Sequence, residues 1–434
     1  MVSTDVAAPL TPAPGAGGAI TREKVRQRHW KLPITLAVGT ILIWIMAFAF
    51  GRDGTSTYRL GDRTSAIDLG DIGVPTAATV TACAILLALM TAYAFWAVAT
   101  YRRVGLWLSI VFAFVAVFAF LTWSAAGGLV PVTGLLFGAV SLSVPLVFGA
   151  LGGVIGERVG VVNVAIEAQF LFAAFTSAIV ASMTGSFVLG LIAAMLAGAL
   201  VGSVLAVFSI KYLVDQVIVG VVLNVLITGL TSFLHGALLN PNAETLNSPP
   251  RFPRWAIPGL SEIPIIGPVV FNQTLIVYLM YIAVPLVAWG LYKTRWGLRL
   301  RAVGEHPQAA DTVGIRVNPT RFWNVLLAGA IAGIGGAYFT LGSVGSFDKE
   351  MTGGLGFIAL AAVIFGGWDP VRATLAALLF GFTTNLETLL TNLGSPIPSE
   401  FMAMLPYIVT ILAVVGFAGQ VRGPAAAGKP YIKG

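Results

Sequence analysis

Long apolar segments alternate with short polar segments along most of this chain. Several of the apolar runs approach or exceed the roughly 18 residues that mark a candidate transmembrane helix. The pattern predicts an all-α, polytopic membrane helix bundle of about ten to twelve transmembrane segments, including broken or re-entrant helices. The predicted spans are residues 33–50, 76–100, 104–123, 132–154, 163–183, 187–208, 217–239, 273–292, 323–343, 355–366, 371–390 and 402–418.

The composition agrees with a membrane setting. Hydrophobic residues make up 57% of the chain and charged residues only 10%, against about 25% charged residues in soluble domains. The 50 glycines suit close helix–helix approach in lipid. Cys83 is the only cysteine, which excludes an internal disulfide and a cysteine-based metal site. We interpret Cys83 as a small buried apolar residue.

The basic residues predict which side of the membrane each segment faces. Five of them precede the first apolar run, at Arg22, Lys24, Arg26, Arg28 and Lys31, so the positive-inside rule places the N-terminus in the cytoplasm. Alternating sides from there leaves 19 of the 25 basic residues inside. The net charge of +7 therefore reflects membrane topology rather than nucleic-acid binding. Residues 1–32 are predicted to be a disordered basic tail, and the tail 421–434 is predicted to be cytoplasmic as well.

A charged stretch at residues 299–314 is the most informative polar segment. Pro307 suits the first position of a helix and Gly314 suits the position just past its end. The residues between them predict a helix of about two turns, with small Ala309 and Ala310 in its middle. A short, small-faced helix held between membrane spans is well shaped to dock into a groove on a soluble partner. The segment thus indicates a membrane component that is driven from outside the membrane.

Two apolar segments are interrupted by polar residues or glycines. Asn163 and Glu167 are four residues apart, hence on one helical face, with Asn163 placed to cap a helix start. Two interpretations stay open for this pair: a capped helix end near the inner surface, or side chains that line a pathway. Residues 351–370 contain five glycines and predict a shortened or broken helix of the kind that lines transporter cavities.

Other residues of the predicted spans divide between structural and transport roles. Glu387 either faces a pathway or reaches the membrane interface, because a charge at the bilayer centre costs at least about 2.5 kcal/mol. Asn224 is expected to join helices by hydrogen bonds. The proline-rich segment 240–272 either caps a pathway, meets an external partner or is a surface linker. Close helix packing is expected at two small-residue pairs, Gly198 with Gly202 and Gly329 with Gly333.

The sequence offers no signal of an enzyme. A phosphate-binding loop needs Ser or Thr after its Gly-Lys pair, whereas the C-terminal tail has Gly428-Lys429-Pro430. The three histidines are far apart in the sequence and predict no metal cluster. No nucleophile–base pair is visible. We therefore predict no catalytic site, no metal and no cofactor, and assign any ATP hydrolysis to another chain.

Three motifs in order resemble those of nucleoside-type ABC importer permeases, a group related to the permeases for simple sugars and branched-chain amino acids. The motifs are Gly156–Gln169, Gly304–Ile315 and Ala361–Pro370. His306 stands where the group usually has Asn, and Asp369 stands where it often has Asn. The resemblance covers about residues 130–420, and residues 33–129 are predicted to form an additional N-terminal transmembrane region.

The resemblance implies a non-catalytic permease subunit of an ATP-driven importer in the bacterial plasma membrane. Its implied partners are an ABC ATPase with two nucleotide-binding domains, a second homologous permease subunit and an extracytoplasmic substrate-binding lipoprotein. The implied substrate is a small neutral solute, first a nucleoside, with simple sugars and branched-chain amino acids as alternatives. The candidate coupling residues, in a cytoplasmic loop near 295–320, are Gly304, Glu305, Pro307, Ala309, Ala310 and Gly314. The candidate pathway residues are Asn163, Glu167, Gln169 and Glu387.

Two other functional classes can be weighed against this one. An ion-coupled secondary transporter would depend on intramembrane carboxylates, for which Glu167 and Glu387 are available. The coupling-type loop argues against that class. A polytopic membrane enzyme would need a cluster of His, Asp or Glu at one membrane face, and the sequence suggests none.

Overall fold

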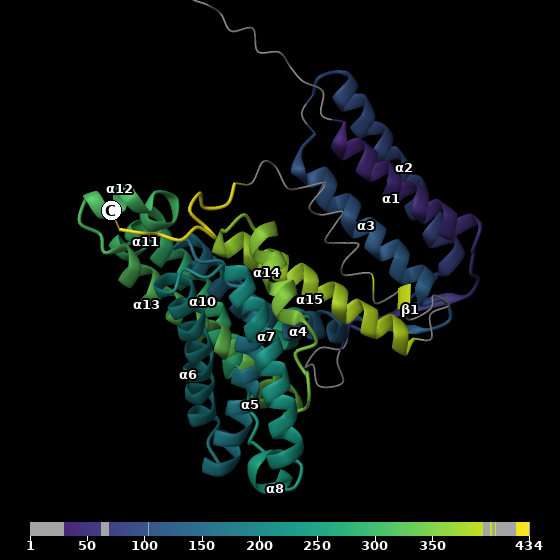
Figure 1. The fold of residues 1–434 in the computed structure, drawn as a ribbon. Helices are drawn as coiled ribbons and strands as arrows, with labels where there is room; N and C mark the ends of the chain where they lie inside the picture. The colour runs from purple at the N-terminus through teal and green to yellow at the C-terminus, as the bar shows by residue number, and fades with distance from the viewer. Residues whose placement is uncertain are drawn as a thin grey trace, which may run out of the picture.

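The computed structural model describes residues 30–61, 69–102, 104–393, 400–401, 404 and 422–433. Over these residues the chain is a helix bundle with a few short strands, which confirms the predicted class (Figure 1). Ten helical segments of the described part are long and apolar enough to cross a membrane. They match ten of the predicted spans. Nearly all of the predicted span 402–418 and of the predicted tail 1–32 lies outside the described residues.

The helices have the following bounds: α1 (Lys31–Phe48), α2 (Thr76–Ala99), α3 (Leu106–Ser124), α4 (Val132–Arg158), α5 (Ile166–Thr184), α6 (Phe187–Ala206), α7 (Gln216–Leu234), α8 (Ala243–Leu246), α9 (Ile266–Val270), α10 (Leu275–Lys293), α11 (Arg295–Glu305), α12 (Pro307–Thr312), α13 (Val317–Ala337), α14 (Leu355–Phe365) and α15 (Pro370–Asn392). Three π-helical turns continue α6, α7 and α13, namely η1 (Val207–Lys211), η2 (His235–Leu239) and η3 (Tyr338–Val344).

The short strands were not predicted from the sequence. In one sheet, β1 (Thr55–Arg59) pairs antiparallel with β2 (Asp71–Pro75) and parallel with β3 (Leu129–Pro131). In the other, β4 (Arg254–Ala256) pairs antiparallel with β5 (Asn272–Thr274). Four of the strands fall within or beside the segments 51–73 and 240–272, and β3 directly precedes α4. Strand β1 lies away from α12 (Figure 1). We call the end of the bundle that carries these strands the sheet end, and the opposite end the α12 end.

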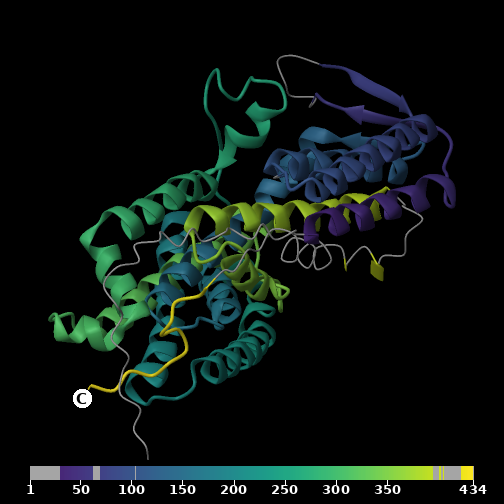
Figure 2. The same ribbon diagram turned by 90° about the horizontal axis from the view of Figure 1, so that it is seen from above.

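Helices α1 to α3 lie side by side next to the far end of α15 (Figures 1 and 2). They share a hydrophobic cluster that includes Leu36, Leu87 and Phe112. The hydroxyl groups of Thr40 and Thr91 lie 2.8 Å apart, which adds a polar link between α1 and α2. A second cluster joins α3 to the starts and ends of later helices through Leu121, Leu135, Leu386 and Leu390. The three helices are thus held to the main bundle at the sheet end.

Helix α4 lies at the centre of the main bundle. Every residue from Ser143 to Glu157 is buried, because α5, α13, α14 and α15 all pack around this helix. A helix that is apolar on every side is expected in such a position. The centre of the bundle therefore consists of α4 and the segments that surround its second half.

Helices α6 and α13 approach each other closely at glycines. Close packing was predicted for each of the two glycine pairs, but not that the two pairs meet. A Cβ atom at Gly329 would overlap the carbonyl oxygen of Gly198, and one at Gly333 would overlap the carbonyl oxygen of Ala194. At Gly202 a Cβ atom would lie 2.9 Å from the carbonyl oxygen of Val325. The packing role predicted for these glycines is confirmed.

The outward faces of several helices are apolar. On α7, Val222, Val225 and Phe233 have 59%, 70% and 69% of their surface exposed. A soluble protein rarely exposes contiguous apolar patches of this kind, whereas lipid chains are their natural neighbours in a membrane. Together with the ten apolar helices, this surface identifies the chain as a multi-pass membrane protein.

The glycine-rich segment 351–370 contains the short helix that the sequence predicted, but the prediction that residues 355–366 span the membrane was wrong. Helix α14 has 11 residues, which span about 17 Å at 1.5 Å per residue and cannot cross a hydrocarbon core of about 30 Å. It begins directly after Gly353 and Gly354, whose φ angles are +55° and +80°. These backbone conformations suit glycine and permit the sharp entry into α14.

Candidate functional site

The short helix α12 forms as the sequence predicted. Pro307 occupies its first turn, where the missing N–H costs nothing. Gly314 follows its end with φ +85°, and its N–H donates to the carbonyl of Asp311 at 2.9 Å. The next N–H, from Ile315, donates to Ala310 at 3.0 Å. This left-handed C-terminal cap satisfies carbonyls that a two-turn helix would otherwise leave free.

The preceding helix α11 was not predicted, since the sequence analysis treated residues 295–320 as a loop. The Thr294 side chain caps it by accepting from the Gly297 N–H at 3.2 Å. Trp296 Nε1 donates to Asn324 Oδ1 on α13 at 2.9 Å. At its other end, a Cβ atom on Gly304 would overlap the carbonyl oxygen of Arg158. Helix α11 is therefore in backbone contact with the end of α4, and Gly304 permits that contact.

The two small residues of α12 face opposite ways. Ala310 is only 3% exposed and packs against the chain itself. Ala309 is exposed, as are Gln308, Thr312 and Val313. A partner that docks on α12 would therefore meet Ala309 and not Ala310. The sequence could not make this distinction, because the two alanines are adjacent and equally small.

The end of α4 is clamped to the turn between α14 and α15. Trp368 Nε1 donates to the Glu157 carboxylate, and Arg158 Nε donates to the Trp368 carbonyl at 2.9 Å. Glu157 is 3% exposed, and its second oxygen has no partner among the described residues. These three residues lie within motifs of the sequence, but no contact between them was predicted. The Glu-Arg pair at the end of an apolar helix was the available signal.

Asn163 and Gln169 form a buried amide pair. Asn163 Nδ2 donates to Gln169 Oε1 at 3.0 Å, and Gln169 Nε2 donates to Asn163 Oδ1 at 3.4 Å. The two residues are 1% and 0% exposed. The prediction that Asn163 caps a helix was wrong: α5 begins at Ile166, its N-cap residue is Ala165, and no side chain caps it. The Asn163 side chain instead hydrogen-bonds to the amide of Gln169, one turn into the helix.

Glu167 points away from that pair, to the start of α14. Its carboxylate accepts from Thr352 Oγ1 at 2.5 Å, from the Gly354 N–H at 2.9 Å and from the Gly356 N–H at 2.6 Å. The first N–H groups of a helix lack partners within the helix, and a carboxylate placed there also complements the helix dipole. Glu167 thus joins α5 to the broken segment 352–356.

Replacing Glu167 with alanine should lower the melting temperature of the purified protein clearly. Each buried N–H that loses its acceptor costs about 1–3 kcal/mol, and this change removes the acceptor of two backbone N–H groups and one hydroxyl. The matched control is Glu387→Ala, because Glu387 is half-buried near the end of α15. Thermal unfolding in detergent measures both. Equal melting temperatures for the two variants would contradict the assigned role of Glu167.

Helix α7 supplies two further side chains that hold the loop between α4 and α5. Gln216 Oε1 accepts from the Val162 N–H at 2.7 Å. Asn224 Oδ1 accepts from the Ala168 N–H at 2.9 Å, and its Nδ2 donates to the Val164 carbonyl at 3.0 Å. The predicted interhelical role of Asn224 is confirmed. Gln216 was missed, because its partner is a backbone group 54 residues away.

The four candidate pathway residues do not form one cluster. Asn163 and Gln169 contact each other, and Glu167 contacts α14 from the same helix as Gln169. Glu387 lies on α15 near Asn385, whose Nδ2 donates to the Leu135 carbonyl at 2.7 Å at the start of α4. In the described part of the chain, no group of three or more His, Cys, Asp or Glu side chains is arranged to hold a metal ion.

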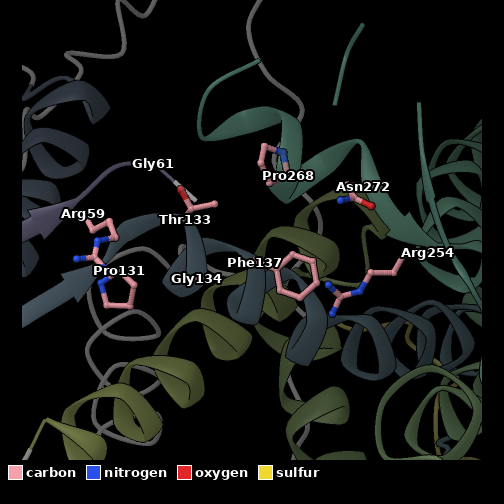
Figure 3. A pocket seen from close by; sticks show the side chains of 9 residues that line it. All are labelled: Arg59, Gly61, Pro131, Thr133, Gly134, Phe137, Arg254, Pro268 and Asn272. Atoms are coloured by element: carbon pink, nitrogen blue, oxygen red, sulfur yellow. The ribbon is translucent and has the colours of Figure 1, made fainter. Parts of the chain in front are cut away.

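A pocket of about 320 Å³ opens at the sheet end (Figure 3). Its size is near the lower limit for small-molecule sites. The guanidinium of Arg254 lies 4.6 Å from the centre of the Phe137 ring. Arg59 forms an ion pair with Asp71 at 3.1 Å, which lowers the pKa of the Asp71 carboxyl. The lining residues are Arg59, Gly61, Pro131, Thr133, Gly134, Phe137, Arg254, Pro268 and Asn272.

The pocket combines an aromatic face with amide, hydroxyl and guanidinium groups. Phe137 supplies an aromatic ring against which the Arg254 guanidinium lies, and Asn272 and Thr133 supply an amide and a hydroxyl group. It lies between β1, the start of α4 and the β4–β5 segment (Figure 3). The sequence did not predict this pocket, because its lining residues come from three segments far apart in the chain.

Known proteins resemble this chain over most of the main bundle. The family described as branched-chain amino acid transport system / permease component matches residues 135–427. The guanosine ABC transporter permease protein NupQ of Bacillus subtilis is 41% identical over 300 residues, which cover 67% of this chain and 93% of NupQ. The nucleoside ABC transporter permease protein NupC of Lactococcus lactis is also 41% identical over 300 residues, covering 67% of this chain and 94% of NupC.

A further relative comes from the same Lactococcus strain. The nucleoside ABC transporter permease protein NupB is 30% identical over 158 residues, which cover 36% of this chain and 43% of NupB. No solved structure matches the chain.

Proposed function

Because the chain belongs to the family of permease components of branched-chain amino acid transport systems, we propose that it is the membrane-spanning subunit of an ATP-driven ABC importer for nucleosides. The observation that carries the proposal is the 41% identity to NupQ and NupC, which are named for guanosine and nucleoside transport. The chain itself has no catalytic role in this account. ATP is hydrolysed by a partner chain.

The α12 end is the cytoplasmic end in this proposal. Basic residues gather there, at Arg158, Arg295, Arg299, Arg301 and Arg316, as the positive-inside rule requires of cytoplasmic segments. The sheet end, with the polar segments around β1 and β4, then faces outward. The same assignment puts both termini in the cytoplasm, at the plasma membrane of a bacterium.

Helix α12 is the coupling helix. Its exposed residues Gln308, Ala309, Thr312 and Val313 would contact the ATPase, while Ala310 and the contact of Gly304 with Arg158 hold the helix to the bundle. Pro307 and Gly314 set its ends, and Glu305 precedes it. ATP binding and hydrolysis would then displace α12 and, through α11, the end of α4.

The transport pathway runs from the sheet end toward the buried amides. The pocket around Phe137 and Arg254 is its outer entrance, with groups that suit a nucleobase and a ribose. Asn163 and Gln169 are the polar groups of its inner part, where their amides can exchange partners with a neutral solute. Glu167 and Glu387 remain candidates on the elements beside it. The inner part of this path offers uncharged amides, which favours an uncharged substrate over an ion.

The partners are an ABC ATPase with two nucleotide-binding domains, a second permease and an extracytoplasmic substrate-binding lipoprotein. Lactococcus lactis has two proteins named as nucleoside ABC transporter permeases, NupC and NupB, and both resemble this chain. That pairing supports a heteromeric membrane unit. The lipoprotein would deliver the nucleoside to the sheet end.

Affinity purification of this chain from its native membrane in a gentle detergent, followed by mass spectrometry, tests the partners. We expect an ABC ATPase and a second permease in the purified complex. An ion-coupled secondary transporter would instead be recovered without an ATPase and would take up solute under an ion gradient. Recovery of the chain alone, active under those conditions, would contradict the proposal.

A further inference from the structure

The C-terminal residues 422–433 lie across the α12 end of the bundle, and we call them the C-terminal strap. In Figure 1 the strap is the yellow segment that runs past α11 and ends near α12. Pro424, Ala426 and Tyr431 are buried, whereas most other residues of the strap are exposed, so the strap is anchored to the fold at these three side chains. Its contacts divide into two groups, one on the α11–α12 pair and one on the transmembrane core.

Two hydrogen bonds join the strap to the end of α11, directly before α12. The Ala426 N–H donates to the Gly304 carbonyl at 2.9 Å, and the Ala425 N–H donates to Glu305 Oε2 at 3.3 Å. Tyr431 is only 8% exposed and belongs to the hydrophobic core cluster of the main bundle. Burial and, after it, the Asp311 carboxylate of α12 raise the pKa of Tyr431 above its ordinary value.

The strap also contacts the core, first at a buried cation. Arg321 on α13 is 2% exposed, and its Nη1 donates to the Lys429 carbonyl at 3.0 Å. Its Nε and Nη2 atoms have no partner within the described residues. Burying a charge is costly unless it is hydrogen-bonded, so the strap carbonyl stabilises Arg321 in this position.

Glycines bring the strap against two more core segments. A Cβ atom at Gly423 would lie 2.9 Å from the Trp368 ring, and one at Gly428 would lie 3.7 Å from Val162. A Cβ atom at Gly160 would lie 3.3 Å from the Ala426 carbonyl oxygen. The strap therefore touches the turn before α15 and the loop 159–165 between α4 and α5. That loop contains Asn163, which belongs to the buried amide pair.

We propose that the C-terminal strap is a coupling element, which links α12 to the loop 159–165 and to α13 so that they move together. The inference rests on the proposed function, because it assumes that a partner displaces α12. A chain of contacts between two sites does not by itself demonstrate coupling. If the strap couples the two sites, removing its contacts should separate ATP hydrolysis from transport.

Two truncations of the full complex provide a matched pair. A chain that ends at Arg422 lacks all the strap contacts described above. A chain that ends at Tyr431 keeps them and loses only residues such as Ile432, which is 71% exposed. Both complexes are reconstituted with their ATPase in proteoliposomes, where guanosine uptake and ATP hydrolysis are measured together. Tyr431→Ala is a third variant, which removes one anchor and leaves the backbone intact.

We expect the chain ending at Arg422 to lose at least about fivefold in uptake per ATP hydrolysed, the lower end of typical coupling between sites. The chain ending at Tyr431 should match the wild type. If the shorter chain does not assemble, Tyr431→Ala decides: a fall in uptake per ATP supports the strap, and a wild-type ratio overturns it. A wild-type ratio in an assembled shorter chain overturns it as well. Absence of ATP-driven uptake by the wild-type complex would instead refute the proposed function, and the strap with it.

Discussion

Replacing Gly329 with leucine should prevent the main bundle from folding. A Cβ atom at this position would overlap the Gly198 carbonyl oxygen, and the backbone of Ala199 lies 3.3 Å away. The obstacles are backbone atoms of α6, which cannot rotate aside as a side chain can. Overpacking of a core costs about 1–3 kcal/mol or more, and here the whole contact between α6 and α13 would have to open. We expect loss of the monodisperse peak in detergent size-exclusion chromatography.

Gly229→Leu is the matched control for this change. Gly229 lies in the exposed part of α7, and a Cβ atom there would meet nothing within 4 Å. Both variants place the same side chain at a helical glycine, so helix propensity and hydrophobicity are equal. Folded, monodisperse protein from Gly329→Leu would show that the close α6–α13 contact is not required.

Replacing Ala309 with tryptophan should abolish ATP-driven uptake while the chain still folds and inserts. Ala309 is exposed on α12, so the new side chain disturbs no packing within this chain. It would instead hold a docked ATPase away from α12. A loss of only about 1.4 kcal/mol of binding free energy lowers the affinity for the ATPase about tenfold. We therefore expect uptake to fall at least about tenfold. Uptake by membrane vesicles and recovery of the ATPase on purification measure the result.

Ala309→Ser is the control, because serine preserves the small size of the residue and should leave uptake near the wild-type level. Ala310→Trp distinguishes the two faces of α12. Ala310 is buried against the chain, so its replacement should reduce the amount of folded protein as well as uptake. Normal uptake by folded Ala309→Trp protein would contradict the role of α12 as the coupling helix.

Features that depend on nearby residues could be predicted from the sequence. The ends of α12 follow from Pro307 and Gly314, whose backbone preferences act within a few residues. The broken helix α14 follows in the same way from the glycines that precede it. The membrane spans follow from long apolar runs. A packing role for the glycine pairs of α6 and α13 was predicted because small residues four apart favour close helix contact in membranes.

Features that depend on the packing of the folded chain could not be predicted from the sequence. Asn163 was expected to cap a helix, but α5 begins later than expected and the Asn163 side chain bonds to Gln169 instead. Helix α11 was missed because its charged residues looked like those of a loop, whereas four buried residues fix it to the bundle. The contacts of Glu167 with residues 352–356 and those of the C-terminal strap with Gly304 span more than a hundred residues. No local pattern predicts such pairings.

The most direct test of the central claim is guanosine uptake by the purified complex in proteoliposomes. The account predicts uptake that requires ATP on the α12 side, requires the ATPase and the second permease, and persists after all ion gradients are collapsed. Uptake by this chain alone, driven by an ion gradient without ATP, would contradict the account and make it a secondary transporter.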